Sequence, residues 1–285
     1  MHSWVNLTLC PAISKDKEYE IALIDSDVLR YELGAITTNH AFVKGYRIPA
    51  ASEFIHKRCE EKIARINSST GGVKFMCIFS GTGNFRFDVA STQKYKGNRD
   101  GFEKPEHWST VNDYLKENYP NAVVNDREAD DYLAERQRRS GNTIICTRDK
   151  DLLVTPGWHY RWSCGENQPE VPPHFVSEWE AWFNFFVQCL IGDTTDNILG
   201  CGERRPTSRA GKKVLWRFGV GKKSAKALLE NCHNQYAMYQ TVRMEYYKLF
   251  GEDWEWKLLE NARLLFVGQR ADDLFDWSWL NKEWK

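Results

Sequence analysis

Short apolar runs of the kind that form buried β-strands recur through the first half of this 285-residue chain. They cover residues 20–24 (EIALI), 73–79 (VKFMCIF), 122–124 and 143–146 (TIIC). Between them lie segments with helical spacing, at 48–67, 108–118 and 128–139. Strands that alternate with helices predict an α/β domain, with helices flanking a central, mostly parallel sheet.

Carboxylates stand directly after these runs, or in the helical segment that follows one. The ligand site of an open parallel sheet lies outside the carboxyl ends of its strands, so we expect these side chains to converge. Like charges that close together require a cation, and hard divalent ions such as Mg²⁺ or Mn²⁺, which commonly act on phosphates, fit carboxylate ligands. The candidate ligands are Asp25, Glu128, Asp130, Asp131, Asp149, Asp151, Asp193 and Asp196.

Taken singly, each acidic motif has a purely structural explanation. E-A-D-D at 128–131 can cap a helix, because carboxylates near a helix N-terminus favour its dipole. T-R-D-K-D at 147–151 and G-D-T-T-D-N at 192–197 can be Asp-rich turns. It is their occurrence together, in this order after Asp25, that favours a metal site.

Global charge indicates no partner, because 39 basic residues balance 39 acidic ones. Nine basic residues and no acidic one lie between 204 and 226, which suits either a polyanion contact or a solvated surface helix. The eight cysteines show no C-x-x-C spacing, and no apolar stretch reaches 18 residues. We therefore expect a cytoplasmic protein without a membrane span.

From residue 177 the sequence becomes helix-like and aromatic, with Trp179, Trp182, Phe183 and Phe186 at steps of three and four. No strand pattern of comparable strength follows. We predict two domains, a sheet domain at 19–176 and a helical region at 177–285, with the Trp-rich C-terminal tail packing back on the sheet domain.

Five motifs in this order resemble the 5′-nuclease family, whose members include flap endonucleases and the 5′-nuclease domains of bacterial DNA polymerases. They are D-x-D at 25–27, Y-K-G-N-R at 95–99, E-A-D-D at 128–131, T-x-D-x-D at 147–151 and G-D-x-x-D-N at 192–197. The resemblance covers roughly residues 20–230, is closest in kind to bacteriophage 5′-to-3′ exonucleases, and implies a PIN-like fold.

The resemblance implies two divalent ions, Mg²⁺ or Mn²⁺, and hydrolysis of DNA phosphodiesters at or near a 5′ end. One ion would be held by Asp25, Glu128 and Asp130 with Asp131 near, and the other by Asp149, Asp151 and Asp196 with Asp193 near. Lys96 and Arg99 would contact the scissile phosphate. The expected substrate is duplex DNA with a 5′ end, flap or gap, or an RNA primer on DNA. The protein would act as a monomer in replication, in the host cytoplasm if a phage encodes it.

A helix-hairpin-helix element is predicted near 214–230 from F-G-V-G-K-K-S-A-K-A-L at 218–228. Its glycines would let the backbone approach a DNA phosphate, and the family often has a monovalent cation such as K⁺ there. A glycine turn between two helices is the structural alternative. The predicted DNA contacts are Gly219, Gly221, Lys222, Lys223, Ser224 and Lys226. The basic stretch 204–213 has no equivalent in the family and is predicted to be a mobile DNA-contacting loop.

The chain departs from the family at the end of its second strand, where F-S-G-T-G-N-F-R at 79–86 puts Gly81 or a neighbour in place of a metal-binding Asp. Either Asp88 reaches back, or the first ion keeps one more water, which Mg²⁺ tolerates. The gap favours one alternative, a catalytically impaired DNA-binding protein. A PIN-like ribonuclease is a second alternative, against which the element near 214–230 argues.

Overall fold

A computed structural model describes residues 15–280, apart from 17, 40–43, 46 and 210–211. The described chain divides into two compact units, which we treat separately. Among the described residues, the sheet unit contains 15–83 together with 101–176, and the helical unit contains 84–100 together with 177–280. Residues 84–100, placed in the sheet domain by the sequence analysis, thus group with the helical unit.

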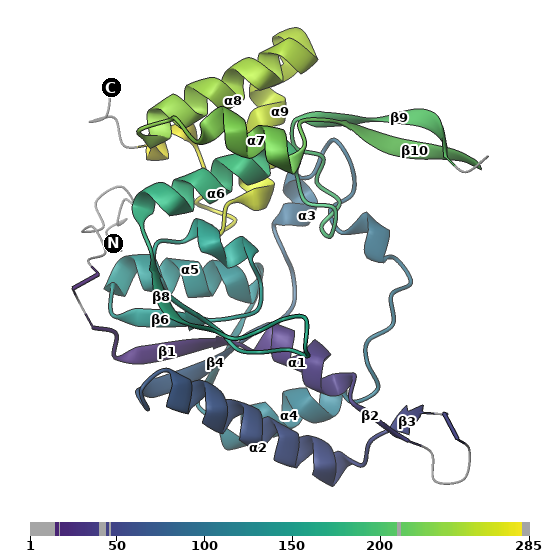
Figure 1. The fold of residues 1–285 in the computed structure, drawn as a ribbon, viewed down its shortest axis with the longest axis vertical. Coiled ribbons are helices and arrows are strands. Elements are labelled where there is room, and N and C mark those ends of the chain that lie inside the picture. The colour runs from purple at the N-terminus through teal and green to yellow at the C-terminus, as the bar shows by residue number, and fades with distance from the viewer. Residues whose placement is uncertain (1–14, 17, 40–43, 46, 210–211, 281–285) are drawn as a thin grey trace. The chain divides into compact units, whose positions relative to one another are not determined.

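The sheet unit is built around six strands, which confirms the predicted α/β fold class. The strands run in the order β5-β4-β1-β6-β7-β8, and β8 alone pairs antiparallel. The first four strands are parallel, so their carboxyl ends meet at one edge of the sheet (Figure 1). Their bounds are β1 Ile21–Asp25, β4 Lys74–Ser80, β5 Asn121–Val124, β6 Thr143–Cys146, β7 Gly157–Arg161 and β8 Val171–Val176.

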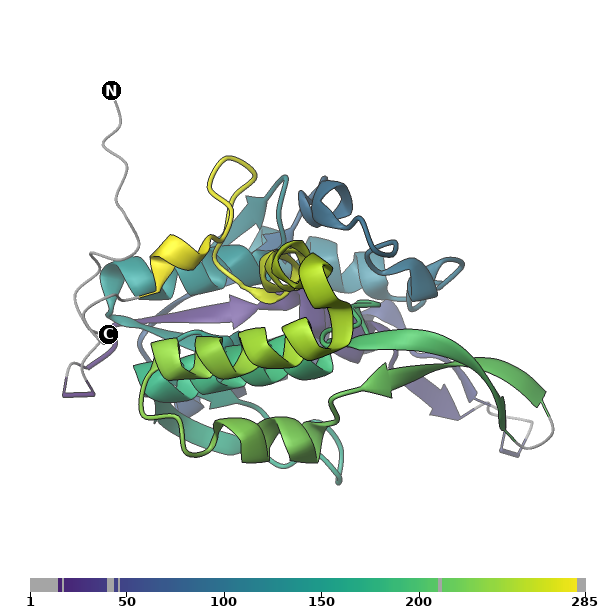
Figure 2. The ribbon, with the colours of Figure 1, turned by 90° about the horizontal axis from the view of Figure 1, so that it is seen from above.

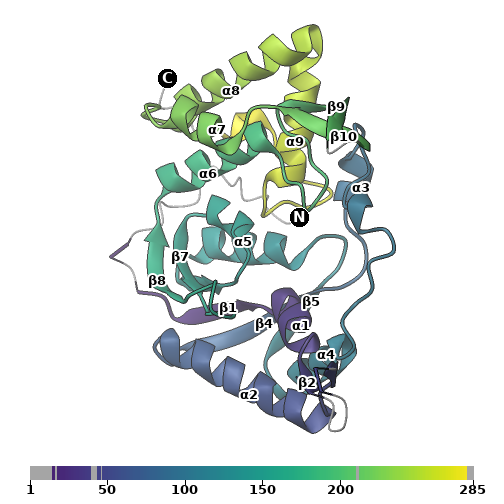
Figure 3. The same cartoon turned by 45° about the vertical axis from the view of Figure 1, so that its right-hand side comes forward.

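Helices cover both faces of this sheet (Figure 3). On one face, α1 (Ser26–Gly34), α2 (Ser52–Ser69) and α4 (Trp108–Asn118) bury a core that includes Leu29, Ile63 and Val111. On the other face lies α5 (Ala129–Ser140), in contact with β1, β4, β5 and β6. A short hairpin of β2 (Thr37–Asn39) and β3 (Arg47–Pro49) and the 3₁₀ turn η3 (Asp151–Val154) complete the unit.

The helical unit is held together mainly by aromatic side chains. Phe185 and Phe186 of α6 (Glu178–Ile191) are fully buried, and Phe185 lies 5.3 Å between ring centroids from both Phe266 and Phe275. Helix α6 also packs against α7 (Lys222–Leu229), α8 (Gln235–Phe250) and α9 (Trp254–Leu265). The remaining helical turns are α3 (Arg86–Val89), η2 (Gly97–Arg99), η4 (Gly251–Asp253) and η5 (Trp277–Trp279).

One expectation for this region was wrong. Residues 202–219 form an antiparallel hairpin of β9 (Gly202–Arg209) and β10 (Lys212–Gly219), not a helical arm or a loop. The ribbon is exposed on both faces, so it lacks the buried apolar run by which a strand is recognised. In the C-terminal tail, the Trp277 ring contacts Phe186 and Tyr239 of the same unit, and the packing of the tail on the sheet domain stays a prediction. Residues 281–285 and the irregular lead at 1–14 lie outside the described residues.

Within the described chain, no helix is both long enough and apolar enough to cross a membrane. The seven cysteines that the structure describes are all free thiols, as expected from their spacing.

Candidate functional site

Asp25 ends β1 and is almost completely buried, with 1% of its surface exposed. One carboxylate oxygen accepts hydrogen bonds from the backbone N–H groups of Asp27 and Val28, which caps helix α1. The other accepts from the Thr147 hydroxyl at 2.6 Å, directly after β6. The local fold therefore fixes this carboxylate between the ends of two central strands.

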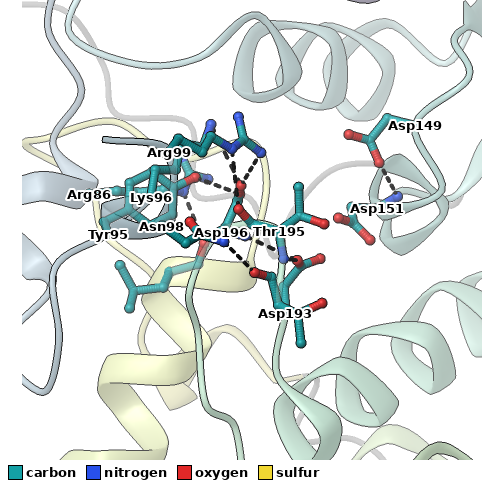
Figure 4. Close-up of polar contacts among 12 residues, drawn as sticks. Arg86, Tyr95, Lys96, Asn98, Arg99, Asp149, Asp151, Asp193, Thr195 and Asp196 are labelled. Atoms are coloured by element: carbon teal, nitrogen blue, oxygen red, sulfur yellow. Dashed lines mark hydrogen bonds and ion pairs between the residues drawn. The ribbon is translucent and has the colours of Figure 1, made fainter. Parts of the chain in front are cut away.

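The motif after β6 continues the same hydrogen-bonded chain. The Thr147 hydroxyl accepts from the backbone N–H of Asp149 at 2.9 Å, and the Asp149 carboxylate accepts from the backbone N–H of Asp151 at 2.8 Å (Figure 4). The Lys150 ammonium donates to Asp151 at 2.7 Å. These bonds fix Asp149 close enough to Asp25 that its charge raises the pKa of Asp25.

The E-A-D-D motif supplies both a helix cap and a candidate ligand. Glu128 and Asp131 form a capping box at the start of α5, in which Asp131 accepts from the Glu128 backbone N–H at 3.2 Å. Asp131 is fully buried. The purely structural explanation therefore accounts for Asp131 and part of Glu128, but it leaves Asp130 without a capping role.

Burial and mutual repulsion perturb the central pair of carboxyl groups. The pKa of Asp25 is raised to about 7, mainly by burial and then by Asp27 and Asp149. The pKa of Asp130 is raised well above its usual range by burial and by four carboxylates, those of Asp25, Asp149, Glu128 and Asp27. Asp25, Asp130 and Asp149 thus act on one another as the sequence predicted, and a cation would relieve the repulsion.

Asp27 is a member of this cluster that the candidate ligand set lacks. Its carboxylate accepts from the backbone N–H of Ser80, at 3.0 Å and 3.3 Å for its two oxygens, and is ion-paired with Arg30. Ser80 is the last residue of β4, where the family usually carries a metal-binding Asp. Asp27 therefore brings a carboxylate to the place where the strand itself has none. The D-x-D motif at 25–27 contains Asp27, but the motif does not indicate which strand end its side chain reaches.

The donor set fits a hard divalent cation, because every candidate ligand is a carboxylate oxygen. In the part of the chain that the structure describes, no group of three or more His, Cys, Asp or Glu side chains is already close enough to hold a metal ion. Carboxylates without a cation between them repel each other, so closer approach is expected only with the ion. Asp88 lies on α3 of the helical unit and hydrogen-bonds through its backbone to Phe85.

In the helical unit, the Y-K-G-N-R segment folds onto the G-D-T-T-D-N loop (Figure 4). The Asp196 carboxylate accepts from the Tyr95 hydroxyl at 2.9 Å and from Arg99 at 2.7 Å, and the Lys96 ammonium lies 3.9 Å away. Asp193 is buried and accepts from the backbone N–H groups of Thr195 and Asp196. The structure thus brings Lys96, Arg99 and Asp196 together, a contact that the motifs did not predict.

Residues with left-handed backbone conformations lie where segment 95–99 contacts loop 192–197. Lys96 and Asn197 are two of only three non-glycine residues with positive φ in the described chain, at 54° and 62°. The Lys96 N–H donates to the Asp196 carbonyl at 2.9 Å, and Asn197 donates through its amide to the Lys94 carbonyl at 2.8 Å. Left-handed conformations of such residues cost energy and persist where the surroundings impose them. Tyr95, Asn98 and Asn197, which hold the two segments together, were not among the predicted site residues.

The predicted DNA-contacting residues begin at the root of the β9–β10 hairpin and continue into α7. Gly219 ends β10 with φ 154°, where a Cβ atom would lie 2.2 Å from the Cys201 carbonyl oxygen. Gly221 is the N-cap of α7, with open space around it. Ala225 and Leu229 bury one face of α7. The exposed positions are Lys222, Lys223, Ser224 and Lys226.

No protein-family model matches the sequence, and no curated protein is significantly similar to it. Several solved structures have a similar fold. A bacteriophage T5 flap endonuclease in a pseudo-enzyme–product complex with DNA and metal ions gives a TM-score of 0.58 at 14% identity, covering 87% of this chain and 89% of that one. A mutant of T5 5′-exonuclease gives 0.52 at 12% identity (87% and 88% covered), and T5 5′-exonuclease with bound zinc gives 0.50 at 15% (85% and 99%). The predicted resemblance to the 5′-nucleases is therefore confirmed for the fold.

We predict that Glu260 of α9 positions the segment carrying Lys96 and Arg99. Its buried carboxylate accepts from the backbone N–H groups of Ser91 and Thr92, both at 2.6 Å. Glu260→Gln should lower the free energy of unfolding by roughly 1–3 kcal/mol and speed hydrogen exchange at those two amides, because the charge-assisted bonds are weakened. Glu255→Gln, at an exposed position on the same helix, is the control. Equal exchange rates at Ser91 and Thr92 in both variants would contradict this role.

Proposed function

We propose that this chain is a divalent-metal-dependent nuclease that hydrolyses DNA phosphodiesters at or near a 5′ end. The observation that supports it most is the carboxyl pair of buried Asp25 and half-buried Asp130, at the carboxyl edge of a parallel sheet, with both pKa values raised. Such a cluster destabilises a protein unless it serves a cation. The same fold occurs in a phage flap endonuclease whose structure contains DNA and metal ions.

The first ion would be held by Asp25, Glu128 and Asp130, with Asp131 near. Asp27 would add the fourth carboxylate, because it lies at Ser80, the end of the strand that lacks one. In the sheet unit, the predicted ligands of the second ion are Asp149 and Asp151. Bound divalent ions of this kind lower the pKa of an attacking water and stabilise the leaving oxygen.

Lys96 and Arg99 would bind and orient the scissile phosphate. Both cations are held at the Asp196 carboxylate, and both are accessible, with 23% and 42% of their side-chain surfaces exposed. A phosphate that approaches this cluster meets two N–H donors able to balance negative charge that develops during cleavage. The Lys96 ammonium group lies 3.9 Å from the Asp196 carboxylate.

The N-terminus of α7 would hold the duplex away from the cut. Backbone N–H groups at a helix start favour phosphate, and the neighbouring Lys222, Lys223 and Lys226 add positive charge. Residues 212–219 are a strand, so the first arm of the predicted helix-hairpin-helix at 214–230 is not a helix. Only the glycine turn and the helix that follows it, α7, support the proposed duplex contact. The same holds for the K⁺ ion expected there.

Cleavage of end-labelled DNA in Mg²⁺ tests the proposed activity. We expect 5′-labelled flap and blunt duplexes to yield short 5′-phosphorylated products, and their lengths separate exonucleolytic from endonucleolytic cutting. An RNA-primed duplex measures primer removal. Asp149→Asn with Asp151→Asn should slow cleavage roughly 100-fold or more, since bound ions contribute several kcal/mol. A double variant as fast as the wild type would refute the metal mechanism.

One specific observation favours a second candidate, a structure-specific DNA-binding protein that has lost catalysis. Ser80 and Gly81 stand where the family usually has a carboxylate. This candidate predicts DNA binding without Mn²⁺ binding and without cleavage.

Asp27→Asn tests whether Asp27 replaces the metal-binding carboxylate that β4 lacks at its end. The amide oxygen can still accept from Ser80 and Arg30, so the fold should persist while the charge is removed. We expect the Mn²⁺ affinity of one site, measured calorimetrically, to fall about 10-fold or more. The exposed Asp113→Asn is the matched control. If Asp27 serves only the structure, both variants will bind Mn²⁺ as the wild type does.

A further inference from the structure

The β9–β10 hairpin is the part of the helical unit that the proposed mechanism leaves unused. All eight residues of each strand are paired, from Lys212 opposite Arg209 to Gly219 opposite Gly202. Beyond its root, the hairpin extends away from helices α6 to α9 (Figure 2). An isolated two-stranded ribbon is only marginally stable in water, so an extended one suggests a binding partner.

The root of the hairpin is anchored firmly. The Arg217 guanidinium donates to the carbonyl oxygens of Leu190, Leu199, Cys201 and Val220 at distances from 2.7 to 3.3 Å. The Leu190 carbonyl belongs to the last turn of α6, whose final carbonyls lack helical partners. Arg217 therefore stabilises the end of α6 and fixes the direction in which the hairpin leaves it.

The root also joins the loop that carries Asp193 and Asp196. Arg204 donates to the Asn197 side chain at 2.8 Å, and Asn197 in turn binds the Lys94 carbonyl. The hairpin thus begins beside the residues proposed to handle the scissile phosphate. A polymer held along the ribbon would be aligned with that loop.

The surface of the ribbon combines positive charge with exposed apolar side chains. Between residues 203 and 218 there are six basic residues and one acidic one in a chain of zero net charge. Leu215, Trp216 and Phe218 are 64%, 44% and 43% exposed. Trp216 lies opposite Arg205, and directly opposed residues share a face of the ribbon. Arg205 is ion-paired with Glu203 in the same strand, an ion pair for which a phosphate could compete.

We propose that the β9–β10 hairpin binds duplex DNA by lying in its major groove, with Trp216 on the groove side and basic side chains against the flanking phosphates. The major groove, about 12 Å wide, admits a two-stranded β-ribbon, and eight residues per strand span about 26 Å. Charge complementarity selects DNA as the partner, because a net charge of this sign and density suits a polyanion. The inference rests on the proposed action on DNA and adds a second contact to that of α7.

Salt-dependent DNA binding by the full chain tests the proposal. Anisotropy of a fluorescein-labelled 30-bp blunt duplex would be measured in EDTA between 50 and 200 mM KCl. Arg205→Gln with Lys213→Gln should reduce the slope of log K against log [KCl] by about 1.8, or 0.9 for each phosphate that the variant no longer neutralises. Arg243→Gln with Lys248→Gln, which removes two exposed charges from α8, should leave the slope unchanged.

Dimethyl sulfate footprinting locates the groove, because guanine N7 lies in the major groove. The wild type should protect guanines that Trp216→Ser leaves reactive. Equal slopes in both double variants, or no N7 protection by the wild type, would overturn the proposal. So would self-association of the wild type that Trp216→Ser abolishes while DNA binding is unchanged. Two outcomes separate this proposal from the proposed function. If the protein cleaves DNA in Mg²⁺ but the hairpin variants bind DNA as the wild type does, only the hairpin proposal is refuted. If the wild type binds no DNA at all, both are refuted.

Discussion

Repulsion between the carboxylates of Asp25, which is buried, and Asp130, which is half-buried, is the constraint on which the rest of the proposed site depends. Asp25 follows β1 and Asp130 follows β5, and the parallel pairing of β1 with β4 and of β4 with β5 brings the ends of these strands to one edge. Thr147, the α1 cap and the Ser80 hydroxyl hold the surrounding groups in place. Folding therefore brings like charges close together, and a bound divalent cation would reduce their repulsion.

In the helical unit, the Asp196 carboxylate has cationic neighbours. Asp196 has Arg99, Lys96 and the Tyr95 hydroxyl around it, so its charge is balanced within the unit. Among the described residues, no cation forms an ion pair with Asp25 or Asp130. The two carboxylate groups therefore differ in charge balance: Asp25 and Asp130 have no ion-pair partner among the described residues, whereas Asp196 already has two cations beside it.

The sequence predicted the elements that bury a continuous apolar face. Residues 143–146 and 108–118 were assigned as a strand and a helix with the bounds that the structure shows, because β6 is buried on both faces and α4 has strict helical spacing. Two elements were missed for different reasons. The β9–β10 ribbon buries neither face and so lacks an apolar run, whereas helix α1, which buries Leu29 and Leu33, follows β1 without a break.

Site residues were predictable where they belong to an acidic motif. The prediction failed at the end of β4, where the carboxylate comes from another element, helix α1. The order of the acidic motifs found Asp25, Asp130 and Asp149, whose charges act on one another in the structure. The absence of a carboxylate near Gly81 pointed instead to extra water or to Asp88. That the Asp27 carboxylate reaches the end of β4 depends on how α1 leaves β1, which is a property of packing that no linear spacing records.

Thermal unfolding of the wild type and of Asp130→Asn at pH 8, with and without Mg²⁺, tests the central claim most directly. Because the folded-state pKa of Asp130 is raised, its ionisation destabilises the fold as the pH rises above the usual range for a carboxyl group. The account predicts that, without metal, Asp130→Asn unfolds at a higher temperature than the wild type, and that Mg²⁺ stabilises the wild type far more than the variant. A variant that is less stable without metal and gains as much from Mg²⁺ as the wild type would contradict it.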